Sequence, residues 1–521
     1  MVLRQRIGLV YLPGALPCFE DFGNLPTDLV CADAQVDGKP ASEVLDMLII
    51  PGGSLVESQS VNDKVTREIL QMADSGKFVL GVCSGFQVLA KETDVGRLST
   101  IPITREGLGL LDAEFKPLVC TDRVRATIID KSFITQEIGR EVAGFHCHTY
   151  GKILLHKDAK PILITHANRI NYKKDPQDLI SGVSNKKGNV VGVFIHSLLD
   201  QNPTIIESIT KSLDINAFEL NLIRQANAKL LEQIKGEVGI ATNIRQQTPI
   251  NQATRLLMVT ATGSGSGKTF VVTGIAGALK KKGFSVGVIK VGGDIRDAVP
   301  TLYLIKEPIK DYSSIKIGES GWTPLQQAVE EAAKKYNFLL VEGAMSAFTG
   351  LLNENYKRPM STAEVAAALG ASTIVVVGCD KEGIEGALIN TLNYVNILKR
   401  LGVKTTGVIL NKLRVSYITD EIRQTMKTAF QNAGIELLGM VPRLDLESRG
   451  MIPEIEIRYE DFGVQAIDAA EKYIDLDLLT KVASAPKNVE VDYMAFMENF
   501  KKLLTNYSLN GPEGGSKQSC S

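Results

Sequence analysis

Residues 256–269 have the sequence LLMVTATGSGSGKT, and this stretch indicates the fold of the second half of the chain. A largely apolar run at 256–260 is typical of a buried strand, and a helical pattern begins near Lys268. A glycine-rich loop that joins a strand to a helix and ends in Gly-Lys-Thr is typical of a phosphate-binding P-loop. Its backbone N–H groups and the positive end of the helix can hold phosphate oxygens. The stretch therefore predicts a nucleotide site on an α/β domain.

Two side chains of this loop have predicted roles. We expect Lys268 to contact the β- and γ-phosphates and the Thr269 hydroxyl to bind Mg²⁺. Thr262 stands where the strict P-loop pattern has glycine, so a merely glycine-rich turn is the alternative interpretation. The predicted nucleotide-binding residues are Thr262, Gly263, Ser264, Gly265, Ser266, Gly267, Lys268, Thr269 and Lys290.

Two carboxylates are expected to complete a magnesium site beside the loop. Asp294 and Glu342 each follow a predicted strand, and the carboxyl ends of parallel strands are where open α/β sheets bind ligands. Since Mg²⁺ prefers oxygen ligands, we predict Thr269, Asp294 and Glu342 as its protein ligands. Each acid is alternatively a solvated side chain or a helix cap. Asp297 is a weaker candidate, for a contact with the substrate.

A second motif, GVCSG at 81–85, lies in the first half of the chain. It follows a predicted strand at 78–82 and precedes a helical pattern at 86–91. A cysteine between two glycines at a strand-to-helix turn is the thiol version of a nucleophile elbow. The helix N-terminus favours the thiolate of Cys83, which makes this residue the predicted nucleophile. The alternative is a lone buried cysteine.

Three further residues are expected to act with the cysteine. Gly52 and Gly53 follow the predicted strand 47–50, and their backbone N–H groups can stabilise an oxyanion. His196 ends the predicted strand 189–195 and is the expected general base. The acid that commonly orients such a histidine is not evident, so the third member of a triad stays open.

Two other histidines, His146 and His148, alternate along a strand-like stretch and therefore share a face. We expect His148 to be structural or to contact the substrate. A metal site on the pair is the less favoured alternative.

Apolar strands alternate with helical patterns in both halves, which predicts an α/β fold with two doubly wound, mostly parallel-sheet domains. The expected strands lie at 7–12, 47–50, 78–82, 161–165, 189–195, 256–260, 285–290, 338–341, 373–378, 405–410 and 435–440. Helical patterns at 61–74 and 217–235 belong to the first domain. We expect a first domain at 1–235, a linker at 236–254, a second domain at 255–480, and a C-terminal helix with a disordered tail at 481–521.

Composition narrows the class of protein. The 521 residues carry 58 Lys+Arg and 59 Asp+Glu, a net charge of −1, which argues against broad electrostatic binding of nucleic acid. The hydrophobic fraction of 44% excludes a disordered chain, and no apolar run is long enough for a membrane span. The seven cysteines lack the paired spacing of a disulfide framework or a zinc ribbon, so we expect a cytoplasmic protein.

Taken together, these motifs resemble those of the cobyric acid and cobyrinic acid a,c-diamide synthases. The first half resembles their class I glutamine amidotransferase domain, which is flavodoxin-like, and the second half their ATP-dependent synthetase domain, which is P-loop NTPase-like and related to dethiobiotin synthetase. The segments that carry the resemblance lie at 12–13, 18–22, 48–53, 81–89, 144–148, 192–196, 261–269, 290–297, 341–345, 361–366 and 407–411.

Two departures from the family pattern concern the order of domains and the substrate side. The amidotransferase half comes first here, whereas the named synthases usually carry it last. Gly293 replaces a family proline, the expected PxxH after Asp297 is absent, and a family RHLGL segment is only SRGMI at 448–452. We therefore expect the resemblance to predict the type of reaction better than the identity of the substrate.

The resemblance implies an ATP-driven, glutamine-hydrolysing carbon–nitrogen ligase that amidates carboxylates of a tetrapyrrole through an acyl phosphate, in cobalamin or related cofactor biosynthesis. The implied cofactors are ATP and Mg²⁺. The implied partners are glutamine and a small-molecule carboxylate acceptor, with no nucleic acid, no membrane and a homodimer as one expectation. Three alternatives stay open: a ligase for a non-tetrapyrrole acid, a non-catalytic P-loop regulatory or binding protein, and a carboxylase like dethiobiotin synthetase, which leaves Cys83 idle.

Overall fold

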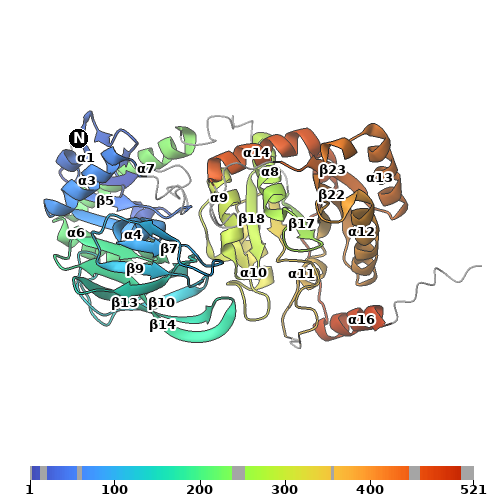
Figure 1. Cartoon of the computed structure of the whole chain (residues 1–521), viewed down its shortest axis with the longest axis horizontal. Coiled ribbons are helices and arrows are strands. Elements are labelled where there is room, and N and C mark those ends of the chain that lie inside the picture. Colours follow the sequence, from blue (N-terminus) through green and yellow to red (C-terminus); the bar gives the residue numbers. More distant parts are fainter. Residues whose placement is uncertain are drawn as a thin grey trace, which may run out of the picture.

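The computed structural model describes residues 3–11, 20–54, 61–237, 253–353, 357–444 and 458–505. The chain forms two α/β parts that lie side by side, blue to green and yellow to red in Figure 1. We call residues 3–237 the N-terminal part and residues 253–505 the C-terminal part. The α/β class expected from the sequence is confirmed.

A ten-stranded sheet forms the centre of the N-terminal part, in the order β16-β11-β10-β13-β14-β15-β6-β5-β1-β2. Its half from β15 to β2 is parallel. The strands are β1 (Ile7–Val10), β2 (Asp28–Val30), β5 (Met47–Ile50), β6 (Phe78–Val82), β10 (Arg123–Ile128), β11 (Glu141–His146), β13 (Ala159–Ile170), β14 (Lys173–Asn185), β15 (Val190–Val193) and β16 (Ile195–His196).

The other half of this sheet departs from the expectation of a mostly parallel sheet. From β16 to β15 every pairing is antiparallel. The reason is a long hairpin of β13 and β14, whose two-residue turn holds Asn171 and Tyr172 at φ 50° and 67°. Two consecutive positive φ values give the tight turn whose twist suits antiparallel strands. The sequence indicated only the short segment 161–165 of this hairpin.

Smaller elements surround the sheet. A four-stranded sheet in the order β12-β9-β7-β8 and a two-stranded sheet β3-β4 were not predicted, because their strands are short and their patterns brief. The remaining elements of this part are η1 (Phe22–Asn24), β3 (Gln35–Val36), β4 (Lys39–Pro40), α1 (Ala41–Val44), α3 (Asp63–Asp74), α4 (Ser84–Leu89), β7 (Glu92–Asp94), β8 (Thr104–Glu106), β9 (Ala113–Lys116), β12 (Lys152–Leu155), α5 (Leu198–Gln201), α6 (Pro203–Ser212) and α7 (Ala217–Glu237).

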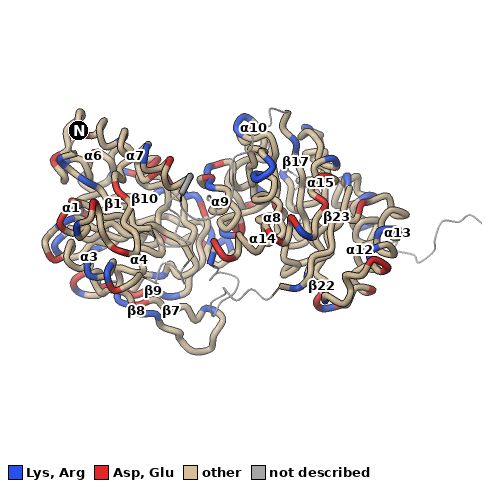
Figure 2. The backbone as a smooth tube through the Cα atoms, turned by 90° about the horizontal axis from the view of Figure 1, so that it is seen from above, with Lys and Arg blue, Asp and Glu red and all other residues tan. Residues whose placement is uncertain are grey.

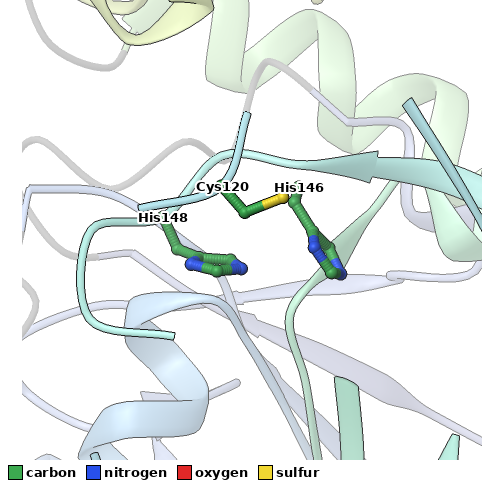
Figure 3. A group of neighbouring side chains, drawn as sticks. All are labelled: Cys120, His146 and His148. Carbon is green, nitrogen blue, oxygen red and sulfur yellow. The ribbon is translucent and has the colours of Figure 1, made fainter. Parts of the chain in front are cut away.

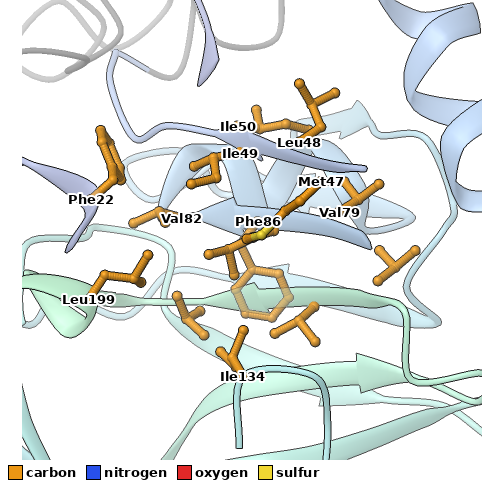
Figure 4. Close-up of a cluster of buried hydrophobic side chains, with 14 of the residues drawn as sticks. Phe22, Met47, Leu48, Ile49, Ile50, Val79, Val82, Phe86, Ile134 and Leu199 are labelled. Carbon is orange, nitrogen blue, oxygen red and sulfur yellow. The ribbon is translucent and has the colours of Figure 1, made fainter. Parts of the chain in front are cut away.

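The core of the N-terminal part packs around β5, β6 and α4 (Figure 4). Phe86 of α4 is fully buried and meets the ring of Phe115 edge-on at 4.8 Å between centroids. A Cβ on Gly192 of β15 would lie 1.8 Å from Phe86 Cδ2, so glycine makes room for this ring. Burial of such an aromatic side chain stabilises the fold by about 1.5–3 kcal/mol and fixes α4 against the sheet.

The C-terminal part is built on a seven-stranded sheet, β19-β18-β20-β17-β21-β22-β23, whose pairings are all parallel. Its strands are β17 (Arg255–Ala261), β18 (Val286–Val291), β19 (Ser314–Ile315), β20 (Phe338–Glu342), β21 (Ser372–Gly378), β22 (Thr405–Leu413) and β23 (Glu436–Pro442). Its helices are α8 (Lys268–Lys281), α9 (Val299–Ile305), α10 (Leu325–Ala333), α11 (Thr362–Ala368), α12 (Gly383–Arg400), α13 (Asp420–Asn432), α14 (Tyr459–Tyr473), α15 (Leu476–Val482) and α16 (Tyr493–Thr505), with short 3₁₀ turns η3 (Ile295–Ala298), η4 (Asp311–Ser313) and η5 (Val415–Tyr417).

Helices cover both faces of this sheet. Alternate residues of β17 enter two different clusters, with Met258 on the face of α10 to α13 and Leu257 on the face of α8, α9 and α14. A strand that is apolar on both faces is typical of a parallel sheet between two helical layers. Figure 1 shows α14 and α8 along one edge of this part.

One of the contacts between the two parts is aromatic. Trp322 of the C-terminal part donates from Nε1 to the Thr121 carbonyl at 3.1 Å. Its ring lies 5.0 Å from that of Phe145 on β11, measured between centroids. Arg123 and Asp311 add an ion pair of 3.1 Å across the same boundary.

The expected strands that fall on described residues are present. Helix α7 matches the pattern expected at 217–235, and α16 the expected C-terminal helix. Most of the predicted linker, the predicted tail from 510 and the segments 12–19 and 448–452 lie outside the described residues, and the three boundaries between the four expected segments remain predictions.

Charge and hydropathy add two observations. Figure 2 shows Lys/Arg and Asp/Glu dispersed over both parts, in line with the net charge of −1. Within the described ranges, no helix combines the length and the apolar character that crossing a bilayer requires.

Candidate active site

Cys83 sits on a strained turn between β6 and α4. Its φ of 52° and ψ of −109° are rare for a residue with a side chain, and such strain is typical of functional turns. A Cβ on Gly85 would lie 2.2 Å from the Ile50 carbonyl oxygen, so only glycine allows the helix to start this close to β5. The glycine spacing of the motif thus has a steric reason, and it presents Cys83 at the helix N-terminus.

The structure brings His196 and Gly52 to this cysteine. A Cβ on Gly52 would lie 3.1 Å from Cys83 Cβ and 3.0 Å from His196 Cε1, so glycine lets the three residues approach. His196 is buried at the end of β16, and its Nε2 has no hydrogen-bond partner among the described residues. Gly53, the second predicted oxyanion residue, lines the same cavity as Cys83.

Glu20 is the acid that the sequence did not identify. Its carboxylate contacts His196 Nδ1, and both side chains are almost completely buried. Burial alone would lower the pKa of His196, but the Glu20 carboxylate and the nearby Cys83 side chain raise this pKa to about 10. A histidine held this way keeps a fixed tautomer and a stabilised imidazolium form, as in a Cys-His-acid triad.

Asp200 of α5 fixes the turn that carries this acid. It accepts the backbone N–H of Gly23 at 2.8 Å and that of Asp21 at 3.2 Å. Burial, together with the charge of Glu20, raises the pKa of Asp200 to about 6. The only sequence signal for Glu20 was its place in the stretch 18–22 that resembles the family's opening segment.

The predicted P-loop joins β17 to α8, with Gly265 and Gly267 at φ of 78° and 79°. Two residues of β22 that had no predicted role hold this loop. Asn411 donates from Nδ2 to the Ser266 carbonyl at 2.9 Å, and Lys412 donates from Nζ to the Gly265 carbonyl at 2.6 Å. Their contacts connect distant strands and leave no local sequence pattern.

A charged cluster lies at the helix end of the loop. Thr269 donates to Glu342 Oε1 at 2.8 Å, and Lys268 and Lys290 lie 3.7 and 3.4 Å from the same oxygen. Burial and the charge of Lys290 lower the pKa of Lys268. Burial alone would lower the pKa of Lys290. The carboxylates of Asp297 and Glu342 outweigh this effect, so the pKa of Lys290 is raised.

The two predicted aspartates have different partners. Asp297 pairs with Lys290 at 2.6 Å and so joins this cluster. Asp294 instead accepts hydrogen bonds from Nε and Nη2 of Arg296, at 2.8 and 2.7 Å. Arg296 also donates to Thr149 Oγ1 of the N-terminal part at 2.7 Å. The Asp294 carboxylate is therefore paired with Arg296 at the boundary of the two parts, whereas Thr269 and Glu342 bond to each other. The role of Asp294 as a metal ligand remains a prediction.

One cavity of about 560 Å³ connects the two motifs. Its wall includes Cys83 and His196 from one part and the loop 263–270 from the other. The wall of this cavity also includes Gly53, His148, Thr149, Asp294, Arg296 and Asp297. The predicted nucleophile and the predicted phosphate loop thus open into a common space at the boundary of the two parts.

Comparison with known families agrees with this division. Residues 6–204 match the family model of the CobB/CobQ-like glutamine amidotransferase domain. Residues 257–451 match that of the CobQ/CobB/MinD/ParA nucleotide binding domain. The matched ranges follow each other in the swapped order that the sequence indicated.

Individual relatives match over part of the chain. Hydrogenobyrinate a,c-diamide synthase of Mycobacterium bovis is 32% identical over 228 residues, which cover 42% of this chain and 48% of that protein. Cobyric acid synthase of Clostridium botulinum is 31% identical over 194 residues, 36% of this chain and 34% of that protein. The chain thus spans about half the length, or less, of these curated relatives. A solved structure of PurLQS from Thermotoga maritima aligns at 21% identity with a TM-score of 0.31, over 40% of this chain and 99% of that one.

Proposed function

We propose that this chain, in which a CobB/CobQ-like glutamine amidotransferase domain precedes a CobQ/CobB/MinD/ParA nucleotide-binding domain, is a glutamine-dependent amide ligase driven by ATP. The observation that carries the proposal is the common cavity, because Cys83 and the phosphate loop face the same space. A ligase of this kind needs ammonia from one half-reaction at the site of the other.

In the first half-reaction, Cys83 attacks the side-chain amide carbon of glutamine. His196 holds the thiol proton as an imidazolium paired with the Cys83 thiolate before the attack, and it then gives this proton to the leaving nitrogen, which departs as ammonia. Backbone N–H groups of Gly52 and Gly53 stabilise the oxyanion. Water, deprotonated by His196, then cleaves the thioester, so that glutamate leaves and the thiol is restored. Glu20 holds the imidazole in place throughout.

In the second half-reaction, a carboxylate oxygen of the acceptor attacks the γ-phosphorus of ATP, and ADP leaves. Ammonia then attacks the carbonyl carbon of the acyl phosphate, inorganic phosphate leaves, and the amide forms. Lys268 and Lys290 offset phosphate charge during the transfer, since both ammonium groups lie in the cluster beside the loop.

The residues present fit a Mg²⁺ ion bound with the nucleotide. Glu342 Oε2 is buried without a hydrogen-bond partner among the described residues, and such an orphaned carboxylate oxygen suits a cation. Thr269 and Glu342 would hold the ion, with Asp294 as a third ligand if Arg296 releases it. When bound, the ion supplies charge neutralisation at the phosphates.

The acceptor is proposed from the relatives. The names of two of them refer to hydrogenobyrinate and cobyric acid, which supports a tetrapyrrole polycarboxylate as the acceptor class. The departures after Asp297 make a non-tetrapyrrole acid the competing acceptor. We also propose a cytoplasmic location, which the free thiols of the described cysteines support. A homodimer is a further part of this proposal.

Glutamate release tests the proposal most simply. The purified chain should hydrolyse glutamine, and MgATP with an acceptor-containing extract should change the rate because the two sites share a cavity. Turnover without any response to nucleotide would indicate a glutaminase that is not coupled to a ligase. Absence of both glutamine hydrolysis and ATP consumption would favour a binding or regulatory protein.

A further inference from the structure

Three side chains of types that can ligate a metal, and that the proposed reaction does not use, form a buried group beside the active site. Cys120 lies on the connection between β9 and β10, and His146 and His148 lie at and just beyond the end of β11. Each offers one donor atom, and the three atoms lie within 4.8 Å of one another. Figure 3 shows the sulfur of Cys120 pointing toward His146.

Backbone pairing sets this arrangement. Cys120 and His148 exchange two backbone hydrogen bonds, from Cys120 N at 3.0 Å and from His148 N at 3.1 Å. His146 is two residues away along an extended segment and therefore lies on the same side as His148. The ring centroids of the two histidines are 4.8 Å apart. The three side chains are thus held together by the fold rather than by rotamers of exposed residues.

The hydrogen bonds of the histidines leave ligand atoms free. His148 Nδ1 lies 3.2 Å from the Leu118 carbonyl oxygen, so this nitrogen donates and Nε2 keeps its lone pair. A metal-ligating histidine usually makes such a bond with its second nitrogen. His146 is fully buried, and neither of its ring nitrogens has a hydrogen-bond partner among the described residues. Buried polar groups usually have a hydrogen-bond partner, and a bound cation would take the place of the partner that the His146 ring lacks.

We propose that Cys120, His146 and His148 form a binding site for a zinc-type divalent cation. One thiolate and two imidazoles are a ligand set that Zn²⁺ takes, and this set disfavours the harder Mg²⁺. In a tetrahedral site ligand atoms lie about 3.5 Å apart, so closure needs side-chain shifts of about 1 Å. Cation binding releases the thiol proton of Cys120 to solvent, and one coordination position stays open to water or to a further ligand.

The site would stabilise the wall behind the nucleophile. Cys147 lies between the two histidines in sequence, and its carbonyl oxygen accepts a long hydrogen bond of 3.7 Å from Cys83 Sγ. A cation held by both neighbours would fix this carbonyl, and with it the position of the thiol. The proposed cation site follows from the geometry of these three side chains and is independent of the proposed ligase reaction.

Metal content of the full chain tests the site. The protein is incubated with zinc chloride, desalted, and analysed by inductively coupled plasma mass spectrometry. About one tightly held equivalent is expected in the wild type, and less than about a fifth of that in Cys120→Ser and in His146→Ala. Cys379→Ser is the matched control, because Cys379 is also buried but lies in the C-terminal part; it should keep the full equivalent.

A second control separates this site from the catalytic thiol. Cys83→Ala should retain zinc, and loss of zinc in that variant would overturn the proposal by placing the metal at the nucleophile. X-ray absorption at the zinc edge of the wild-type protein needs no variant and should show one sulfur and two imidazole nitrogens. Absence of retained zinc, or a coordination shell without sulfur, would overturn the proposal even if the Cys120 variant failed to fold.

Discussion

Glu20 and His196 are separated by 176 positions in the sequence, yet the Glu20 carboxylate contacts Nδ1 of the imidazole in the buried space behind Cys83. The contact completes a Cys-His-acid arrangement whose acid comes from the N-terminal segment rather than from the histidine's own strand. Asp200, four residues after His196, holds the turn that carries Glu20 by accepting hydrogen bonds from two backbone N–H groups of this turn.

Replacement of this acid should change the pH dependence of glutamine hydrolysis. The pKa of His196 is raised to about 10, so the imidazolium persists up to that pH in the wild type. Glu20→Gln removes the carboxylate charge that raises this pKa, which should then fall toward the ordinary value. The alkaline limb of the glutaminase pH profile should therefore move to lower pH, and kcat should fall by about 10²-fold.

Asp21→Asn is the matched control for this experiment, because Asp21 is the adjacent acid and is partly exposed. Its pH profile should follow that of the wild type. An unchanged alkaline limb in Glu20→Gln would show that Glu20 does not control His196.

Removal of the nucleophile should separate the two half-reactions. Cys83→Ala should lower glutamate release by at least about 10³-fold, because no thioester can form. ATP consumption with ammonium chloride as the nitrogen source should persist in this variant, since the phosphate loop is untouched. Glutamate release at the wild-type rate would rule out Cys83 as the nucleophile.

Loss of the loop lysine should have the opposite pattern. Lys268→Ala should abolish ATP consumption with either nitrogen source by removing a cation beside the phosphates. Basal glutamine hydrolysis should remain measurable. Lys282→Ala, just beyond the far end of α8, where the side chain pairs with Asp477, serves as the control and should behave like the wild type. Sustained ATP turnover in Lys268→Ala would contradict the assignment of the loop.

The boundary contact of Arg296 should couple the two sites. Arg296 bridges Asp294 in one part and Thr149 in the other, on the wall of the common cavity. Arg296→Ala should raise the ratio of glutamine hydrolysed to ATP consumed, because ammonia is no longer retained between the sites. Arg125→Ala, which loses only an exposed ion pair with Glu141, should leave the ratio unchanged. An unaltered ratio in Arg296→Ala would exclude this role.

The parts of the site that are local in sequence could be predicted from it. Cys83 and the phosphate loop each lie between a strand and the helix that follows, so spacing and glycine content suffice to place them. His196 could be placed because it ends a continuous apolar strand.

The remaining features depend on contacts between distant segments. Glu20 reaches His196 through a turn held by Asp200, and Cys120 meets two histidines through a backbone bridge, so no spacing rule reveals either. The sequence likewise did not indicate that Asp294, a predicted metal ligand, is paired with Arg296. The antiparallel pairing in one half of the first sheet was not predicted, because most of the strands there are short or partly polar.

A label-transfer assay tests most directly whether one cavity couples glutamine hydrolysis to amide formation. Purified protein, MgATP and glutamine with heavy nitrogen in its side-chain amide are added to a small-molecule extract, and mass spectrometry searches for a labelled amide. We expect a labelled product that disappears with Cys83→Ala. A labelled tetrapyrrole would establish the proposed acceptor class, and a labelled product of another kind would keep the reaction and replace the acceptor. No labelled product together with no glutamine hydrolysis would contradict the proposed coupling.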